Sequence, residues 1–195
     1  MTLSSWLRFS FWLVLIPWSA LADDHDEHPR RVEVIAEAEI ARIPITYAWA
    51  VDTRDIDLLM TLFSENAVYD LSAYDFPSAT GKAAIRKVFL EGILDNVRCS
   101  FISISNIQVE VDGDRATGAD YFVHAGYDPR NRPKHTRSHT EGQHFYEFEK
   151  EAGAWKIARM RGSPTFEKWE TYDPEGLRQC RPTVLPSRPG FVARP

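Results

Sequence analysis

The feature that most constrains the fold is a change of hydrophobic period along the chain. From Arg31 to about Val51, apolar residues recur every three to five positions, which is the spacing of one face of a helix. Beyond about residue 100 the pattern alternates instead, most clearly over 107–111, as it does in a strand with one buried face. Helices followed by a run of strands predict an α+β domain, in which the helices pack against an antiparallel sheet.

The helical half of the chain predicts three helices and one short strand. Pro44 lies inside the first helical pattern and predicts a kink or a break, because proline lacks an N–H and clashes with the preceding turn. Thr80 is expected to cap the third helix. The predicted elements are helices over 31–51, 56–64 and 81–94, and a strand over 67–71.

The second half predicts a four-stranded antiparallel meander. Asp112-Gly113-Asp114 is a hairpin signal between its first two strands, and a polar loop is expected over 128–139. The predicted strands cover 101–111, 115–125, 142–150 and 154–162. Twisted sheets with bulges curve readily, so a sheet wrapped round the first helix is expected to form a cone that encloses a pocket.

The two ends of the chain carry signals of another kind. Residues 1–22 predict a secretory signal peptide, which ends in the cleavage motif Ala20-Leu21-Ala22. Its apolar stretch is too short to span a membrane, which takes about 20 residues. We therefore expect a periplasmic or secreted protein without a membrane span after cleavage near Ala22. The remaining parts are a charged flexible leader over 23–30, one domain over 31–162, and a Pro-rich irregular tail over 163–195.

The cysteines suit an exported chain but leave their pairing open. Cys99 and Cys180 are the two cysteines of the sequence, and a disulfide between them would persist outside the cytosol. Such a bridge would pin the tail to the domain. Two unpaired thiols are the alternative, because sequence does not fix the Cα–Cα distance, which a bridge limits to about 7 Å.

Charge and composition argue against several classes of partner. The net charge is −5 and the pI about 5.7, so no basic excess is available for a phosphate backbone and no nucleic-acid partner is expected. Aromatic residues make up 12% of the chain, enough to fill a core or to line an apolar pocket. His135, His139 and His144 form a spaced group, but no carboxylate or cysteine completes a strong ligand pattern, so neither metal nor cofactor is expected.

Several short motifs follow one another in a recognisable order over about residues 31–161. They are Tyr47–Asp55, Leu62–Tyr69, Thr80–Arg86, Ser105–Asn106 with Val109–Ala116, Gly142–Glu147 and Gly153–Ile157. Together they resemble the SnoaL-like branch of the nuclear transport factor 2-like superfamily. That branch includes scytalone dehydratase, lindane dehydrochlorinase, bile acid dehydratase and polyketide cyclases. The resemblance implies a curved sheet and helices that form a cone around an apolar pocket.

Asp52, at the end of the first predicted helix, is the main candidate for acid–base chemistry. In the family, an aspartate at this place pairs with a histidine that lies four residues before the residue matching Asn106. That position is Ile102 here, so the family dyad is not intact, because isoleucine cannot relay a proton. Burial in an apolar cone would raise the pKa of Asp52 and suit it to general acid–base work. The alternative is that Asp52 merely caps the next helix beside Asp55.

Two histidines are candidates to replace the missing partner. Strand alternation places His144 on one face with Tyr146 and Phe148, and His124 on one face with Asp120 and Phe122. Alternation alone does not say which face points inward, and a single strand histidine is often structural. The candidate site is completed by residues expected to bind substrate, which are Tyr47, Tyr69 and Asn106.

Three functions remain open from the sequence. The favoured one is a cofactor-free lyase or isomerase, dehydratase-like, acting on a small apolar cyclic molecule with Asp52 as general acid or base. The alternative is a non-catalytic small-ligand-binding module of the same fold, which the missing dyad histidine favours. A third is a structural role, in which the outer face of the sheet forms a homodimer; exposed apolar residues on that face would support it.

Overall fold

The computed structural model describes residues 24–172, apart from 95, 96, 98 and 129–134. The predicted signal peptide, Cys180 and the tail beyond Tyr172 lie outside the described residues. In chain order, the elements are α1 (Asp24–Asp52), α2 (Ile56–Thr61), β1 (Phe63–Asp70), the 3-10 turn η2 (Ser72–Tyr74), β2 (Ala79–Thr80), α3 (Lys82–Lys87), the π-helical η3 (Val88–Leu94), β3 (Cys99–Asp112), β4 (Arg115–Asp128), β5 (His135–Glu151) and β6 (Ala154–Tyr172).

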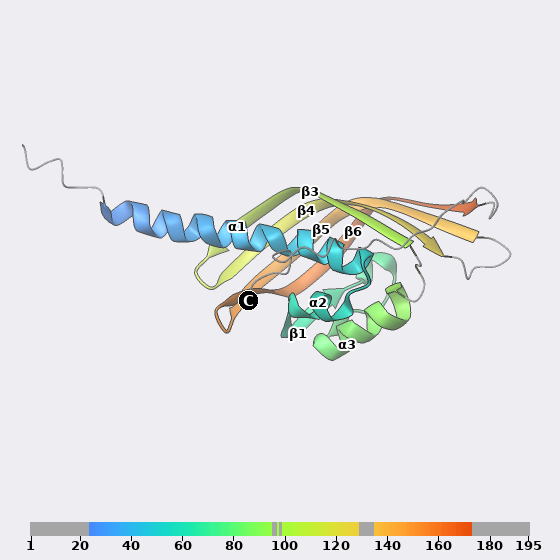
Figure 1. Ribbon diagram of the computed structural model, residues 1–195, viewed down its shortest axis with the longest axis horizontal. Coiled ribbons are helices and arrows are strands. Elements are labelled where there is room, and N and C mark those ends of the chain that lie inside the picture. The colour runs from blue at the N-terminus through green and yellow to red at the C-terminus, as the bar shows by residue number, and fades with distance from the viewer. Residues whose placement is uncertain (1–23, 95–96, 98, 129–134, 173–195) are drawn as a thin grey trace, which may run out of the picture.

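The sheet has six strands in the order β2-β1-β6-β5-β4-β3. Strands β3 to β6 pair antiparallel in chain order, whereas β1 runs parallel to β6. The sheet is curved and is not closed, with α1 lying along it and the short helices gathered beside β1 (Figure 1). The predicted α+β class with a curved sheet is therefore confirmed.

Helix α1 is longer and more continuous than the sequence suggested. It begins at Asp24, so the part of the predicted leader that the structure describes is helical. It also passes through Pro44 without a break. Pro44 is fully buried, and its packing offsets the cost of a proline inside a helix, which is about 3 kcal/mol. The buried stripe of α1 includes Ile40, Ile43 and Tyr47.

Several predicted boundaries are wrong, for local reasons. Helix α2 ends at Thr61 and β1 begins at Phe63, two residues later, because Phe63 joins the sheet opposite Ile157. Thr80 belongs to β2 rather than capping α3, whose N-cap is Gly81.

Strands β5 and β6 extend beyond their predicted ends. The segment from His135, expected to be part of a loop, already pairs with β4 and β6. Strand β6 continues past Gly162 to Tyr172, so the prediction of irregular chain from Ser163 is wrong for this stretch. Strand β4 likewise continues to Asp128.

The register of the sheet decides which side chains face the helices. Residues directly opposite one another in an antiparallel pair project from the same face. His144 lies between Asp120 and Gly162, and His124 lies opposite Ile102. The face that carries these histidines is the inner one, because His144 and Asp120 are both buried.

The outer face of the sheet carries exposed apolar side chains and one hollow. The exposed residues are Phe101, Tyr121, Val123, Phe145 and Phe166. The hollow, of about 500 Å³, is lined by residues of β3 to β6 that include Phe145, Arg159 and Arg161. It lies on the opposite face from the histidines, so it is not the predicted inner pocket, which stays a prediction.

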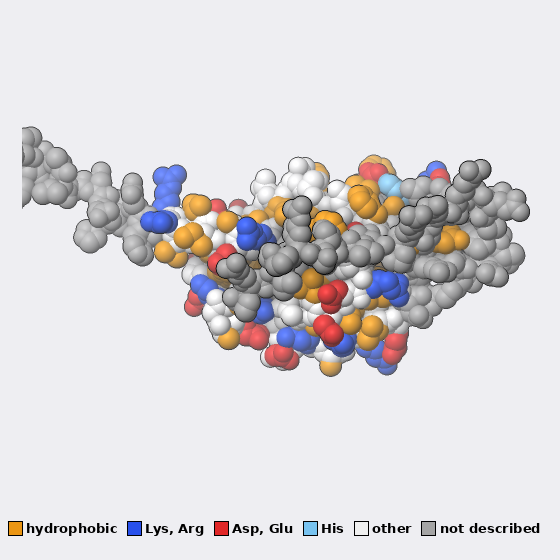
Figure 2. All heavy atoms as spheres, in the orientation of Figure 1, with side chains coloured by type: hydrophobic (Ala, Val, Ile, Leu, Met, Phe, Trp, Pro, Cys, Tyr) orange, Lys and Arg blue, Asp and Glu red, His pale blue; other side chains and the backbone are white. Residues whose placement is uncertain are grey.

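Ion pairs cover the side of the molecule where the short helices lie. Lys82 contacts Glu65, and Arg86 contacts Asp57. Figure 2 shows acidic and basic side chains next to one another along this edge. Among the described residues, no helix combines the length and apolar character of a membrane span.

Candidate active site

A buried carboxylate joins two side chains of β5 at the centre of the inner face. Asp120 Oδ1 lies 2.9 Å from His144 Nδ1, and the hydroxyl of Tyr146 donates to Asp120 Oδ2 at 2.8 Å. Asp120 is 1% exposed and His144 6%. Because a carboxylate accepts hydrogen bonds, this contact favours the tautomer of His144 that carries its proton on Nδ1. In that tautomer Nε2 is the acceptor.

Aromatic rings fix the orientation of the His144 imidazole. Phe122 stacks on it with ring centroids 4.2 Å apart and an interplanar angle of 12°. Tyr47 and Tyr146 meet it edge-on at 5.9 and 5.8 Å. A histidine held by a carboxylate at one nitrogen and by rings on its sides has the tautomer and the rigidity that a general base needs.

Two tyrosines extend this group towards α1 and β1. The phenols of Tyr47 and Tyr69 lie close enough for each to influence the pKa of the other. Burial raises the pKa of both phenols, and neighbouring tyrosines raise that of Tyr47 further. Both hydroxyls therefore stay protonated across the physiological range and can donate to an oxygen.

Asp52 lies at the end of α1 and is held by β3. Its carboxylate accepts hydrogen bonds from Ser100 Oγ at 2.8 Å and from the backbone N–H of Ile102 at 3.0 Å. Burial raises the pKa of Asp52, against the two hydrogen bonds, which lower it. The cap of α2 is Asp55, which accepts from the N–H of Leu58 at 2.9 Å. The contacts of Asp52 are thus to the sheet rather than to the next helix.

His124 stands directly across the strand pair from Ile102, the position where the family histidine is missing. Its ring leans over Gly126: a Cβ on that glycine would lie 2.9 Å from His124 Cε1 and 2.9 Å from Ser138 Oγ. A side chain at this position would have to displace the imidazole or the Ser138 hydroxyl. Gly126 is in turn opposite Ser100, so the ring lies beside a residue that holds Asp52.

Burial lowers the pKa of His124 to about 4, with smaller contributions from His139 and His144. The imidazole is consequently neutral at pH 7, when it can donate from one ring nitrogen and accept at the other. The inner face therefore carries two groups able to move protons, one around His144 and one around Asp52 and His124.

The remaining predicted residues lie elsewhere. Asn106 is exposed at the bulge of β3, with a left-handed φ of 53°, a conformation that asparagine tolerates. His139 contacts Glu141 at 2.9 Å, and the side chain of His135 lies outside the described part of the chain. Within the described residues, no set of three or more His, Cys, Asp or Glu could hold a metal ion.

Asp120 is the site residue that sequence reasoning missed. The sequence placed it on a face with His124 and Phe122, but nothing local marks it as the partner of His144. The signal is the pairing of β4 with β5, which sets Asp120 opposite His144. That register follows only once both strands are correctly bounded.

Comparison with known families identifies the domain. The family model of the SnoaL-like domain matches residues 32–161. The chain belongs to the SnoaL-like family. The match covers most of the described residues and includes Asp52, Asp120 and both inner-face histidines. No curated protein matches the chain significantly.

Solved structures agree with this assignment of the SnoaL-like domain. A proposed aromatic ring hydroxylase from Novosphingobium aromaticivorans is 26% identical, covers 71% of this chain and 94% of its own, and has a TM-score of 0.63. A proposed scytalone dehydratase from the same organism is also 26% identical, with coverages of 72% and 89% and a TM-score of 0.61. A hexachlorocyclohexane dehydrochlorinase is 16% identical, with coverages of 79% and 99% and a TM-score of 0.63, and shows the shared fold.

Proposed function

We propose that this SnoaL-like protein is an exported, cofactor-free lyase or isomerase that acts on a small apolar, cyclic molecule. The observation that carries the proposal is the buried contact of Asp120 with His144 and Tyr146. A buried carboxylate costs free energy unless it is hydrogen-bonded. Here its hydrogen bond with Nδ1 favours one tautomer of His144. That arrangement suits proton abstraction by His144 Nε2.

Elimination also needs a proton donor at a second position, and the inner face offers one. In this mechanism His144 Nε2 takes a proton from carbon while the leaving oxygen, breaking its bond to the neighbouring carbon, takes a proton from the Asp52 end. Asp52 is the general acid or base there, and His124 lies across the strand pair from Ile102, whose N–H donates to Asp52. Tyr47 and Tyr69 donate hydrogen bonds to a substrate oxygen. The similarity to a proposed scytalone dehydratase supports this reaction class.

The alternative is a binding module of the same fold that carries out no reaction. The observation in its favour is Ile102, which removes the family's dyad histidine from the strand that holds Asp52. On this reading the tyrosines and His144 bind a polar group of an apolar ligand, and no proton moves.

Turnover by the purified mature protein separates the two functions. Small cyclic alcohols and enones are incubated with wild-type protein and with the His144→Gln and Asp52→Asn variants, and products are followed by liquid chromatography with mass detection. Catalysis predicts product with the wild type and at least a hundredfold loss in each variant. His139→Gln, a surface histidine on the same strand, is the matched control and keeps full activity.

The contrary outcome is equally definite. Ligands that bind wild type and both variants equally well, and that are recovered unchanged, overturn the catalytic proposal and leave the binding module. Full activity of the Asp52→Asn variant removes Asp52 from the mechanism.

Export and self-association complete the proposed function. Cys99 is disulfide-bonded, which supports an oxidising compartment. N-terminal sequencing of protein recovered outside the cytosol is expected to begin at Asp23; retention of residues 1–22 contradicts export.

The exposed aromatic residues of the outer face support a homodimer, and Phe145→Glu is expected to give a monomer in sedimentation velocity.

A further inference from the structure

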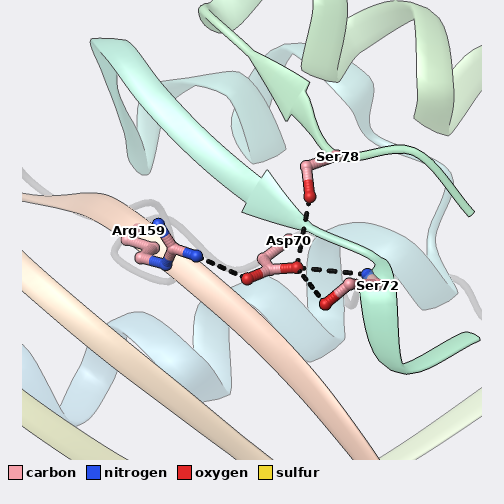
Figure 3. Close-up of polar contacts among 4 residues, drawn as sticks. All are labelled: Asp70, Ser72, Ser78 and Arg159. Carbon is pink, nitrogen blue, oxygen red and sulfur yellow. Dashed lines mark hydrogen bonds and ion pairs between the residues drawn. The ribbon is translucent and has the colours of Figure 1, made fainter.

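The segment between β1 and β2 is a loop whose two ends are tied to one carboxylate. Asp70 Oδ1 accepts from the Ser72 N–H at 3.1 Å, from Ser72 Oγ at 2.7 Å and from Ser78 Oγ at 3.1 Å. Its Oδ2 accepts from Arg159 of β6 at 2.5 Å. Figure 3 shows these four side chains converging, so that a single buried group closes the neck of the loop and fastens it to the sheet.

These hydrogen bonds also fix the charge of the neck. The bonds from Ser72, followed by those from Arg159 and Ser78, hold the pKa of Asp70 well below its usual range. Asp70 thus remains an acceptor for all its partners at any physiological pH. Asp70 therefore fastens both ends of the loop, at Ser72 and Ser78, to one point of the sheet.

The tip of the loop lies against the inner face of the sheet beside His144. A Cβ added to Gly162 would lie 2.9 Å from both Cε2 and the hydroxyl of Tyr74. Gly162 is directly opposite His144 in the register, and cross-strand Cβ positions lie about 5 Å apart. The Tyr74 ring therefore occupies the space above Gly162, on the strand beside His144.

The two aromatic residues of the tip have opposite environments. Burial raises the pKa of Tyr74, and the neighbouring Tyr69 raises it further. Its hydroxyl therefore stays protonated, like those of Tyr47 and Tyr69. Phe76 is 65% exposed and points away from the domain. Asp75, between them, adopts a left-handed conformation with φ 60°, which turns the chain sharply after Tyr74.

We propose that Tyr74 is a specificity-determining residue that covers His144 and contacts the substrate, and that Asp70 is the positioning residue that holds it there. The inference rests on the proposed function, since it assigns Tyr74 to the same site. A molecule that reaches the His144 ring along this side meets the Tyr74 ring and hydroxyl first. The missing side chain at Gly162 is what makes room for that ring.

Chemical access to His144 tests this without a known substrate. Diethyl pyrocarbonate acylates a neutral imidazole, here at Nε2, and peptide mass spectrometry gives the rate for each histidine. The ratio of the His144 rate to that of half-buried His139 is the readout, which cancels differences in reagent. Tyr74→Ala is expected to raise this ratio at least fivefold, whereas Tyr74→Phe, which keeps the ring, leaves it within twofold.

Two further variants guard against a general loosening of the fold. Phe76→Ala, on the same loop but facing solvent, is the matched control and leaves the ratio unchanged. Gly162→Ala displaces the Tyr74 ring and raises the ratio at least twofold, but has no further effect when combined with Tyr74→Ala. Asp70→Asn raises it by releasing the neck.

An unchanged ratio in Tyr74→Ala, or an equal rise in Phe76→Ala, overturns the proposal. The result is independent of the proposed reaction, because acylation needs no turnover. If His144→Gln keeps full activity while Tyr74→Ala exposes His144, the proposed base fails and the cover stands. If instead His144→Gln loses activity and Tyr74→Ala leaves the acylation ratio unchanged, Tyr74 does not cover His144, and His144 remains the proposed base.

Discussion

Replacing Asp120 separates its two contributions, which are holding the network together and setting the tautomer of His144. Asp120→Ala leaves two buried donors without an acceptor, His144 Nδ1–H and the Tyr146 hydroxyl. Each unsatisfied buried donor costs about 1–3 kcal/mol, so the expected loss in the free energy of unfolding is about 2–6 kcal/mol. Asp120→Asn keeps the size and one acceptor oxygen, and its expected loss is about 1–2 kcal/mol, because charged hydrogen bonds become neutral ones.

The two variants are compared by urea unfolding, with Glu110→Ala as the matched control. Glu110 is an exposed carboxylate on the outer face, and its removal is expected to change stability by no more than about 0.5 kcal/mol. In turnover, Asp120→Asn nevertheless loses a factor of about 10²–10⁴, because its amide donates to Nδ1 and moves the ring proton to Nε2. A loss of stability below about 1 kcal/mol in Asp120→Ala refutes the network. Equal destabilisation by both variants refutes the separation of roles.

Three other predictions follow from the site and its surroundings. The pKa of His124 in the folded protein, about 4, lies below the unfolded value of about 6.5. The free energy of unfolding is therefore highest above about pH 6.5 and falls towards pH 4 by about 1.4 kcal/mol per pH unit at most. Urea titrations of His124→Gln should lack this pH dependence, and an unchanged slope contradicts the prediction. Asp52→Asn should stay folded, within about 1–2 kcal/mol of wild type, because its amide oxygen still accepts one of the two hydrogen bonds; circular dichroism that shows unfolding contradicts this. Reduction of the Cys99 disulfide should lower stability by about 2–4 kcal/mol in thermal scans, and peptide mapping should give Cys180 as the partner; an unpaired Cys180 rules that pairing out.

The sequence predicts the fold class because hydrophobic period is a local property. The alternation over 107–111 and the turn at Asp112-Gly113-Asp114 define a hairpin without reference to the rest of the chain. The first half of β5 escapes this reasoning, since its inward side chains include Ser138 and Thr140, which are buried but not apolar. A strand whose buried face is polar shows no hydrophobic alternation.

The end of β6 escapes prediction for a different reason. Pro164 normally argues against a strand, because it cannot donate to the ladder. Here it lies opposite Gly142, beside a register shift that separates this pair from Glu141 and Phe166. A bulge interrupts the ladder where the missing donor would otherwise be felt, so the strand resumes beyond it. This accommodation of Pro164 depends on the neighbouring strand β5, so the sequence of β6 alone does not reveal it.

The candidate site likewise contains residues that the sequence predicts and residues that it does not. Asp52, His124 and His144 follow from residue type, spacing and resemblance, because each is the kind of side chain that moves protons. Asp120 and Tyr74 do not, since their importance comes from the partners opposite them in space, His144 and Gly162. Pairing across strands joins residues far apart in sequence, and only the assembled sheet reveals which ones meet.

The protonation of the His144 ring is the most direct test of the central claim. Long-range ¹H–¹⁵N correlation spectra at pH 7, assigned with His144→Gln, distinguish the two neutral tautomers from the charged ring. We expect a proton on Nδ1, held by Asp120, and a bare Nε2 with the nitrogen shift of an acceptor. A proton on Nε2, or on both nitrogens, would rule out His144 as the base.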